Sequence, residues 1–183
     1  MANRIFQDLS SFVMPPNFRG RGVIFVQFWW IVQSLIFRNS PQYLYKFRAF
    51  LLRCFGAKIG KNVLIRPTVK VTYPWKLRIG DCSWIGDDVV LYSLGIIDIG
   101  DHSVISQRSY LCAGDHDYQI SSFPIRGRNI VVESEVWVAT DVYISPGVVI
   151  GRGAVVGARS SVFSDLPGGW VCVGSPCKAV KLR

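Results

Sequence analysis

Aliphatic residues recur every six positions along most of the chain, commonly with a small residue directly after them. These positions are 59, 65 and 71, then 79, 85 and 91, then 99, 105 and 111, and finally 132, 138, 144, 150, 156 and 162. An amphipathic helix needs apolar positions three and four residues apart, and a half-buried strand alternates strictly. Neither period explains a six-residue step. Short parallel strands stacked in the coils of a solenoid do explain it.

The spacing between successive sets predicts how the coils stack. A triangular coil of three hexapeptides returns to the same side after eighteen residues, and here the returns fall at 59, 79, 99, 132 and 150. The first two intervals are each two residues longer than this, near 72–78 and 92–98. The interval from 99 to 132 contains a much longer excursion, which begins after Leu111 and holds His116, one of two histidines. We expect this excursion to project from the solenoid.

Residues 22–58 follow a different pattern. The run from Val23 to Phe37 is apolar on nearly every side, and the sequence after it has apolar spacing compatible with a helix. The run is shorter than the ~20 residues of a membrane span and contains Gln27 and Gln33. It starts too late for a signal peptide and lacks a small-residue cleavage site. Two interpretations stay open: a helical cap that shields the strand edges at one end of the solenoid, and an interfacial helix on an anionic lipid surface.

Charge supports the second interpretation without excluding the first. The net charge of +9 is concentrated in residues 1–58, where eight Lys and Arg side chains face a single acidic residue, Asp8. Trp29, Trp30 and the flanking arginines suit a peripheral membrane contact through residues 22–58. Nucleic acid is not expected as a partner, because the charge coincides with an apolar aromatic run rather than with a solvated basic stripe.

Composition adds limits on organisation and location. A length of 183 residues predicts one domain, or one domain with an appendage. Half of the residues are hydrophobic and 18% are charged, which indicates a folded globular protein. Five cysteines without a C-x-x-C pair favour a reducing cytoplasm, with the chain peripheral to the inner membrane if residues 22–58 bind lipid. We divide the chain into an N-terminal segment (1–58), a solenoid (59–166) with a loop at 112–131, and a C-terminal tail (167–183).

Four motifs resemble those of the hexapeptide-repeat acyltransferases, in particular the colanic acid biosynthesis acetyltransferase group. They are IGDDVVLYS (85–93), IDIGDHSVISQRSYLCAGDHDY (97–118), VWVATDVYISPGVVIGRGAVVGARSSV (136–162) and VGSPCKAVK (173–181). The resemblance covers residues 45–183. It implies a left-handed parallel β-helix and a homotrimer with three sites. It also implies acetyl-CoA as co-substrate and, as acceptor, a sugar hydroxyl of a surface polysaccharide or of a lipid-linked glycan precursor.

The resemblance gives His116 the role of catalytic base. An alcohol is a poor nucleophile until a base takes its proton, and imidazole does this well near neutral pH. Asp98 and Asp117 are candidates for orienting the ring, although solvated loop carboxylates or a backbone carbonyl as orienter are equally open. His102, in the repeat IGDHSV, is expected to be structural or to face solvent.

Donor contacts are also implied by the resemblance. The oxyanion formed on the thioester needs preorganised donors, and the Ala139 N–H and Thr140 are the candidates. Trp137 is expected either to pack against the pantetheine arm or to fill the core. Gly157 and Ala158 are expected to offer backbone contacts along a groove between subunits.

The two ends of the predicted site are less well defined. Ser175, Pro176 and Lys178 are expected to meet the nucleotide end of the coenzyme, where a lysine suits a phosphate. Tyr92 and Ser93 are expected to face the acceptor. Better-known sugar acetyltransferases of this family carry an asparagine that helps hold the acceptor, and the coil before His116 has none.

Two alternatives to acetyl transfer remain. A zinc carbonic anhydrase on the same fold needs three histidine ligands, and the chain has two histidines, so no metal is expected. A non-catalytic β-helix scaffold or assembly subunit would keep the shape without the reaction. Such a scaffold would bind no coenzyme A.

Overall fold

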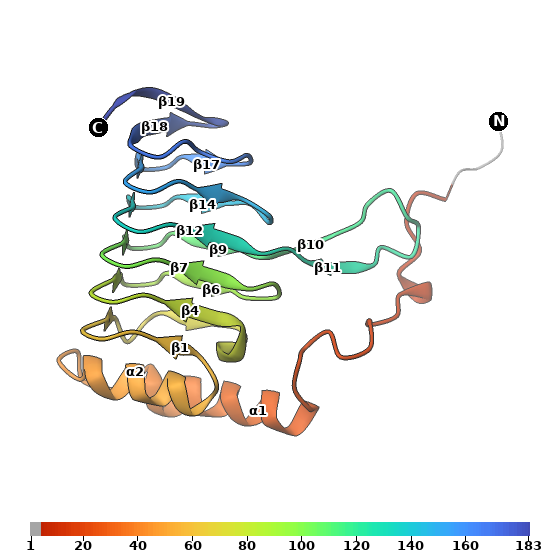
Figure 1. The fold of residues 1–183 in the computed structure, drawn as a ribbon. Helices are drawn as coiled ribbons and strands as arrows, with labels where there is room; N and C mark the ends of the chain where they lie inside the picture. Colours follow the sequence, from red (N-terminus) through yellow and green to blue (C-terminus); the bar gives the residue numbers. More distant parts are fainter. Residues whose placement is uncertain (1–4) are drawn as a thin grey trace.

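The aliphatic positions of the six-residue repeat line the interior of a solenoid. The structure is a computed structural model that describes residues 5–183, and none of these positions has more than 8% of its surface exposed. Successive hexapeptides form short strands on three different parallel sheets, so the chain winds around a triangular prism (Figure 1). The predicted left-handed parallel β-helix with an N-terminal helical segment is confirmed.

Each side of the prism is one sheet. Sheet A contains β1 (Lys58–Ile59), β4 (Leu77–Ile79), β7 (Ile97–Ile99), β12 (Ile130–Val132) and β15 (Val149–Ile150). Sheet B contains β2 (Leu64–Ile65), β5 (Trp84–Ile85), β8 (Val104–Ile105), β13 (Trp137–Val138), β16 (Val155–Val156), β18 (Trp170–Gly174) and β19 (Cys177–Leu182). Sheet C contains β3 (Lys70–Val71), β6 (Val90–Tyr92), β9 (Tyr110–Cys112), β14 (Tyr143–Ile144) and β17 (Ser161–Val162). The predicted returns at 59, 79, 99, 132 and 150 all fall on sheet A, which confirms the coil arithmetic.

Where a glycine follows the aliphatic position, the neighbouring coil requires it. A Cβ added to Gly80 would lie 2.7 Å from the backbone carbon of Gly100, one coil further along. Atoms that close must move apart, so glycine here permits close approach of two backbones and does not supply an unusual dihedral angle.

Two helices close the end of the solenoid at which the chain enters it. α1 (Val23–Val32) continues into the π-helical η2 (Gln33–Phe37), and α2 (Tyr45–Cys54) lies beside them beneath β1 (Figure 1). Short 3-10 turns, η1 (Leu9–Ser11) and η3 (Pro74–Lys76), complete the helical elements. Within residues 5–183, no helix combines the length and apolarity that crossing a membrane requires.

Side chains of these helices pair with backbone groups of the first coil on all three sheets. The pairs are Arg53 Nε to Ile59 O (2.9 Å), Arg48 Nε to Ile65 O (2.6 Å), Trp29 Nε1 to Val71 O (2.9 Å) and the Val71 N–H to Gln33 Oε1 (2.6 Å). An exposed strand edge would otherwise offer these groups to another chain. The interpretation of this segment as a cap is therefore confirmed.

The opposite end closes differently. Residues 167–183, described above as a tail, add β18 in parallel to β16, and β19 then folds back antiparallel on β18. The guanidinium of Arg183 donates to the carbonyl oxygens of Glu135 (2.8 Å) and Gly153 (3.1 Å). The last coil is thus covered by the chain's own C-terminus.

Arg48 is the side chain on which the cap depends most. It is fully buried and also donates to Ser40 Oγ (2.9 Å) and to the carbonyls of Pro41 (2.8 Å) and Gln42. Arg48→Met should lower the free energy of unfolding by about 3 kcal/mol, because several buried acceptors lose their donor. Urea titration followed by circular dichroism measures this. Lys46→Met, the same change at an exposed position of α2, should stay within about 0.5 kcal/mol of the original, and equal effects of the two would contradict the assignment.

Candidate active site

The excursion that holds His116 is a two-stranded hairpin. β10 (Gly114–His116) pairs antiparallel with β11 (Ile125–Gly127), and His116 lies opposite Ile125. The hairpin leaves the solenoid between β9 of sheet C and β12 of sheet A and extends well beyond the prism (Figure 1). Its position at the corner between sheets C and A leaves sheet B on the opposite side of the prism.

The His116 ring is held by Phe123 of the same hairpin. His116 Nδ1 lies 2.8 Å from the Phe123 carbonyl oxygen, and the two rings stack with centroids 4.2 Å apart and planes 9° apart. A carbonyl oxygen only accepts hydrogen bonds, so Nδ1 carries the hydrogen and Nε2 has a free lone pair in the neutral ring. The ring of Phe12, in the N-terminal segment, is tilted relative to the His116 ring, with centroids 6.3 Å apart.

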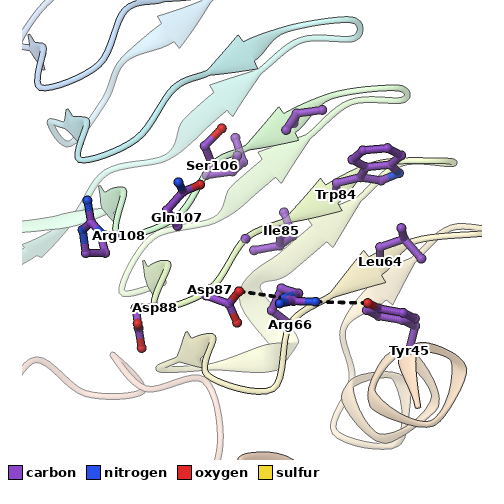
Figure 2. Close-up of a pocket in the computed structure, with 13 residues that line it drawn as sticks. Tyr45, Leu64, Arg66, Trp84, Ile85, Asp87, Asp88, Ser106, Gln107 and Arg108 are labelled. Carbon is purple, nitrogen blue, oxygen red and sulfur yellow. Dashed lines mark hydrogen bonds and ion pairs between the residues drawn. The ribbon is translucent and has the colours of Figure 1, made fainter. Parts of the chain in front are cut away.

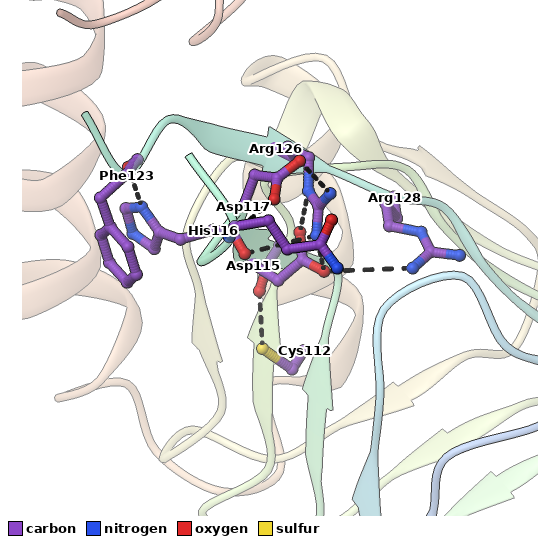
Figure 3. Close-up of polar contacts among 9 residues, drawn as sticks. Cys112, Asp115, His116, Asp117, Phe123, Arg126 and Arg128 are labelled. Atoms are coloured by element: carbon purple, nitrogen blue, oxygen red, sulfur yellow. Dashed lines mark hydrogen bonds and ion pairs between the residues drawn. The ribbon is translucent and has the colours of Figure 1, made fainter. Parts of the chain in front are cut away.

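Charged residues at the foot of the hairpin set its geometry (Figure 3). Asp115 accepts two hydrogen bonds from the Arg126 guanidinium, at 2.9 and 3.0 Å, and Asp117 accepts a third at 3.0 Å. Arg128 lies 4.0 Å from Asp115. The hydrogen bond to Asp115 raises the pKa of Arg126 above its ordinary value. This fork ties β10 to β11 and orients the strand that ends in His116.

Neither carboxylate expected to orient His116 faces the ring. Asp117 is paired with Arg126 and also accepts from the Gln119 N–H at 3.1 Å. Asp98 lies on the outer face of sheet A, where it pairs with Arg78 at 3.4 Å. The open alternative, a backbone carbonyl, is the group found at Nδ1. The two carboxylates do not reach the ring because Arg126 holds Asp117 and Arg78 holds Asp98. The hairpin instead brings the Phe123 carbonyl to the ring.

The predicted donor residues fall in a row along the corner that follows sheet B. β8, β13, β16 and β18 are successive neighbours in this sheet, so the residues just after them stack above one another. Thr140 Oγ1 donates to the Gln107 carbonyl of the previous coil (3.0 Å), and the Thr140 carbonyl accepts from the Arg159 N–H of the next (2.9 Å). Thr140, Gly157 and Ala158 therefore lie along one edge of the prism.

The residues in this row differ in whether their backbone N–H groups are free to donate a hydrogen bond. The Ala139 N–H donates to the Val156 carbonyl at 2.9 Å, so it is already used in the sheet and is not free for an oxyanion. No partner occupies the Thr140 N–H among residues 5–183. The Gly157 N–H likewise donates to Cys172 O (2.8 Å), whereas Ala158 is exposed. Within this row and residues 5–183, the backbone N–H groups without a partner are those two residues after β13 and β16, at Thr140 and Ala158.

The remaining donor-side residues are accessible. Trp137 is 48% exposed on the outer face of sheet B, and its indole N–H donates to Ser106 Oγ at 3.1 Å, so it is not core filler. Ser175, Pro176 and Lys178 are exposed in the β18–β19 hairpin.

The two residues predicted to face the acceptor, Tyr92 and Ser93, differ in their exposure to solvent. Tyr92 is half-buried beside Tyr110, with ring centroids 6.1 Å apart, and burial raises its pKa. Ser93 is fully buried, its hydroxyl donating to the Tyr73 carbonyl (3.0 Å) and accepting from the Tyr73 N–H (2.8 Å). Ser93 therefore joins two coils, and we omit it from the acceptor site. His102 is exposed in a turn with φ of 54°, as expected for a corner residue.

A groove that sequence reasoning missed lies on the outer face of sheet B (Figure 2). Its volume is about 580 Å³, and it runs from Tyr45 of α2 past Trp84 to Arg108. Arg66 donates to Asp87 (2.8 Å) and to the Tyr45 hydroxyl (3.2 Å), which lowers the pKa of Tyr45. The signal was available, because Arg66 and Asp87 are one coil apart and carry opposite charges. Its floor is apolar, and the arginines at its two ends, Arg66 and Arg108, are each paired with an aspartate.

Across the part of the chain that the structure describes, no three His, Cys, Asp or Glu side chains gather in a group able to hold a metal ion. His102 and His116 belong to different regions, the first to a turn after sheet A and the second to the projecting hairpin.

Comparison with known proteins gives consistent matches. The chain is 60% identical over 177 residues to "Putative colanic acid biosynthesis acetyltransferase WcaF" of Escherichia coli, covering 97% of each chain. The crystal structure of a maltose O-acetyltransferase from Clostridium difficile is 26% identical, covers 87% of both chains and has a TM-score of 0.80. A hexapeptide-repeat acetyltransferase from Vibrio cholerae in complex with acetyl coenzyme A is 25% identical, covers 87% of this chain and 88% of its own, and has a TM-score of 0.78.

No protein-family model matches the chain. The identity to the E. coli protein nevertheless extends over nearly the whole length of both chains, and the solved structures share the same stacked coils. On this evidence, the chain belongs to the hexapeptide-repeat acetyltransferases, in the group of the colanic acid biosynthesis acetyltransferases.

Proposed function

We propose that the protein transfers an acetyl group from acetyl-CoA to a sugar hydroxyl in surface polysaccharide biosynthesis, with His116 as general base. The observation that carries this proposal is the bond from His116 Nδ1 to the Phe123 carbonyl, which leaves Nε2 free as a proton acceptor. The donor is supported by the relative from Vibrio cholerae, which was solved with acetyl coenzyme A, and the acceptor class by the maltose O-acetyltransferase.

The proposed reaction needs one proton acceptor and one oxyanion site. Nε2 of His116 takes the proton of the sugar hydroxyl while the hydroxyl oxygen attacks the carbonyl carbon of the thioester. The resulting oxyanion accepts a hydrogen bond from the Thr140 N–H, which has no other partner within residues 5–183. As the carbon–sulfur bond breaks, the imidazolium returns its proton to the sulfur of coenzyme A. The products are the acetyl ester and free coenzyme A.

The row of residues along the edge of sheet B is proposed to carry the coenzyme. Trp137 presents an exposed indole beside Thr140, and Ala158 and the Gly157 carbonyl continue the same edge in the next coil. At the end of the row, Ser175, Pro176 and Lys178 are exposed, and the ammonium group of Lys178 suits a phosphate of the nucleotide.

Within one chain, the proposed base and the proposed coenzyme row lie at different corners of the prism. His116 projects from the corner between sheets C and A, whereas the Thr140 row lies along the edge that joins sheets B and C. A base on one chain and a donor row on its neighbour would meet if chains pack around a common axis, and we propose a homotrimer with three sites.

The outer faces of the prism differ in the way that such packing requires. Sheet A carries Lys58, Arg78 and Asp98 outward, and charged side chains suit contact with water. Sheets B and C carry mostly apolar and aromatic side chains outward, including Trp84, Trp137, Tyr110 and Tyr143. Exposed apolar faces of this extent are typical of subunit interfaces.

The acceptor is proposed to be a sugar of the polysaccharide or of its lipid-linked precursor at the cytoplasmic face of the membrane. Tyr92 is the remaining predicted contact, because its ring lies one coil below Tyr110 at the foot of the hairpin. The name of the E. coli relative refers to colanic acid biosynthesis, which supports a surface polysaccharide as the product.

His116→Ala should lower kcat by about 10² to 10⁴, because it removes the general base. Release of the coenzyme A thiol in the presence of sugar acceptors measures turnover, and the midpoint of thermal unfolding should change little. His102→Ala is the matched control, since it removes the chain's other histidine, which is exposed. Unchanged turnover in His116→Ala would exclude the role of His116. If the wild-type protein neither catalyses acetyl transfer nor binds coenzyme A, the result would favour the scaffold alternative.

Lys178→Ala should raise the KM for acetyl-CoA by about fivefold with little change in kcat, because an exposed charge contact contributes about 1 kcal/mol. Steady-state kinetics with varied acetyl-CoA measure both constants. Lys181→Ala, three residues further along β19 and also exposed, is the control and should leave the KM unchanged. If the two variants raise the KM equally, general basicity and not a contact at Lys178 explains the effect.

Sedimentation equilibrium should give a mass of three times the chain mass of 20.5 kDa. Tyr110→Glu places a charge on the outer face of sheet C and should shift the protein to monomers, with loss of turnover. Val131→Glu makes a similar change on the outer face of sheet A, and there the trimer should persist. A monomeric original chain with full activity would be incompatible with a shared site.

A further inference from the structure

We infer that the outer face of the helical cap, formed by α1, η2 and α2, docks on an anionic lipid surface. This inference goes beyond the proposed function, since it concerns a surface at the end of the solenoid that contributes nothing to the Thr140 row or the His116 hairpin. Its evidence is the combination of an exposed apolar stripe, a local excess of cations and the orientation of both helices.

The first helix presents one apolar face to the solenoid and another to the outside. Ile24, Phe28, Ile31 and Leu35 are 87%, 55%, 54% and 66% exposed, at the four- and three-residue spacing that places side chains on one side of a helix. The opposite side is buried against the first coil, and its residues are Val26, Trp29, Val32 and Phe37. Most of the exposed stripe therefore faces away from the first coil, although the Phe28 ring also contacts that of buried Phe55, with centroids 5.6 Å apart.

The second helix extends the same surface. Phe47 and Phe50 of α2 are exposed, and so is Tyr43, in the turn that precedes the helix. Both helices lie across the end of the prism, so their outer sides face away from the coils (Figure 1). A layer of helices in this orientation can lie flat on a planar surface, with the apolar side chains directed into it.

Charge identifies the kind of surface. Between residues 9 and 80 the sequence contains twelve Lys and Arg residues and no Asp or Glu. Arg21, Arg38 and Lys46 are exposed around the apolar stripe, and among residues 5–183 none of the three has a carboxylate partner. Cations at the rim of an apolar face match the anionic headgroups and acyl chains of a lipid leaflet.

A second copy of the chain fits this surface less well. Cap-to-cap packing would bring the same cations from both copies together, with no acidic side chain in the caps to neutralise them. A leaflet that contains anionic lipids supplies both the negative charge and the apolar layer. The hairpin with His116 leaves the side of the prism and not its capped end, so docking would leave the hairpin accessible.

Flotation of the full chain with vesicles tests the inference. The protein should float with vesicles of phosphatidylcholine mixed with phosphatidylglycerol, and much less with phosphatidylcholine alone. Phe28→Ser combined with Ile31→Ser should lower the partition coefficient by about tenfold or more, because two exposed apolar side chains are lost. Arg38→Glu combined with Lys46→Glu should abolish the preference for the anionic vesicles.

The control carries exposed apolar residues at the other end of the solenoid. Val180→Ser combined with Leu182→Ser, on β19, should float like the original chain. Circular dichroism confirms that each variant is folded. Absence of the original chain from the anionic vesicles, or equal flotation of the Phe28 and control variants, would overturn the inference. A third result would also overturn the inference: the unsubstituted protein does not float, and the Phe28→Ser/Ile31→Ser variant has a lower mass in solution. That result would assign the outer face of the cap to a contact between copies of the chain.

Turnover separates this inference from the proposed function. All of the cap variants should transfer acetyl groups to a soluble sugar acceptor at the original rate, since the cap contributes no residue to the site. Flotation without any turnover would leave docking in place and remove the proposed reaction. Turnover without flotation would do the reverse.

Discussion

Stacked coils are stable only if the strand edge of the first coil finds hydrogen-bond partners. Every coil of a parallel β-helix satisfies its backbone groups on the next coil, so only the two end coils have free edges. Arg48, Arg53 and Trp29 supply the missing partners at one end, one on each side of the prism. A buried arginine is costly unless its donors have acceptors. Arg48 makes four hydrogen bonds, three to carbonyl oxygens and one to the Ser40 hydroxyl.

With its ends closed, the solenoid acts as a rigid frame that presents functional groups on its corners. Residues that follow successive strands of sheet B stack at the same corner, which converts a six-residue period into a row of contacts such as Gln107, Thr140 and Arg159. The His116 hairpin is the one long departure from the coils between Ile59 and Val162. Its own arginine–aspartate fork holds it, so its geometry does not depend on the frame alone.

The ring of His116 is oriented by a neutral group. The Phe123 carbonyl fixes the tautomer and the stacked Phe123 ring fixes the plane, without a formal negative charge beside the imidazole. The aspartates next to His116 in sequence instead neutralise Arg126. The aspartates that adjoin His116 in the sequence therefore hold the hairpin together, and a carbonyl seven residues away orients the ring. In the same way, Ala139 next to Thr140 uses its N–H in the sheet.

The solenoid, its coil boundaries, the excursion that carries His116 and the helical character of residues 22–58 could be predicted from the sequence, because each depends on local periodicity or on a break in it. The hairpin pairing, the position of the cap, the free backbone donors and the paired carboxylates could be seen only in the folded chain. Several of these features depend on atoms one coil away, some 20 to 33 residues distant along the chain. The hexapeptide pattern specifies that coils stack, but the partner of each polar group follows from what the adjacent coil places against it.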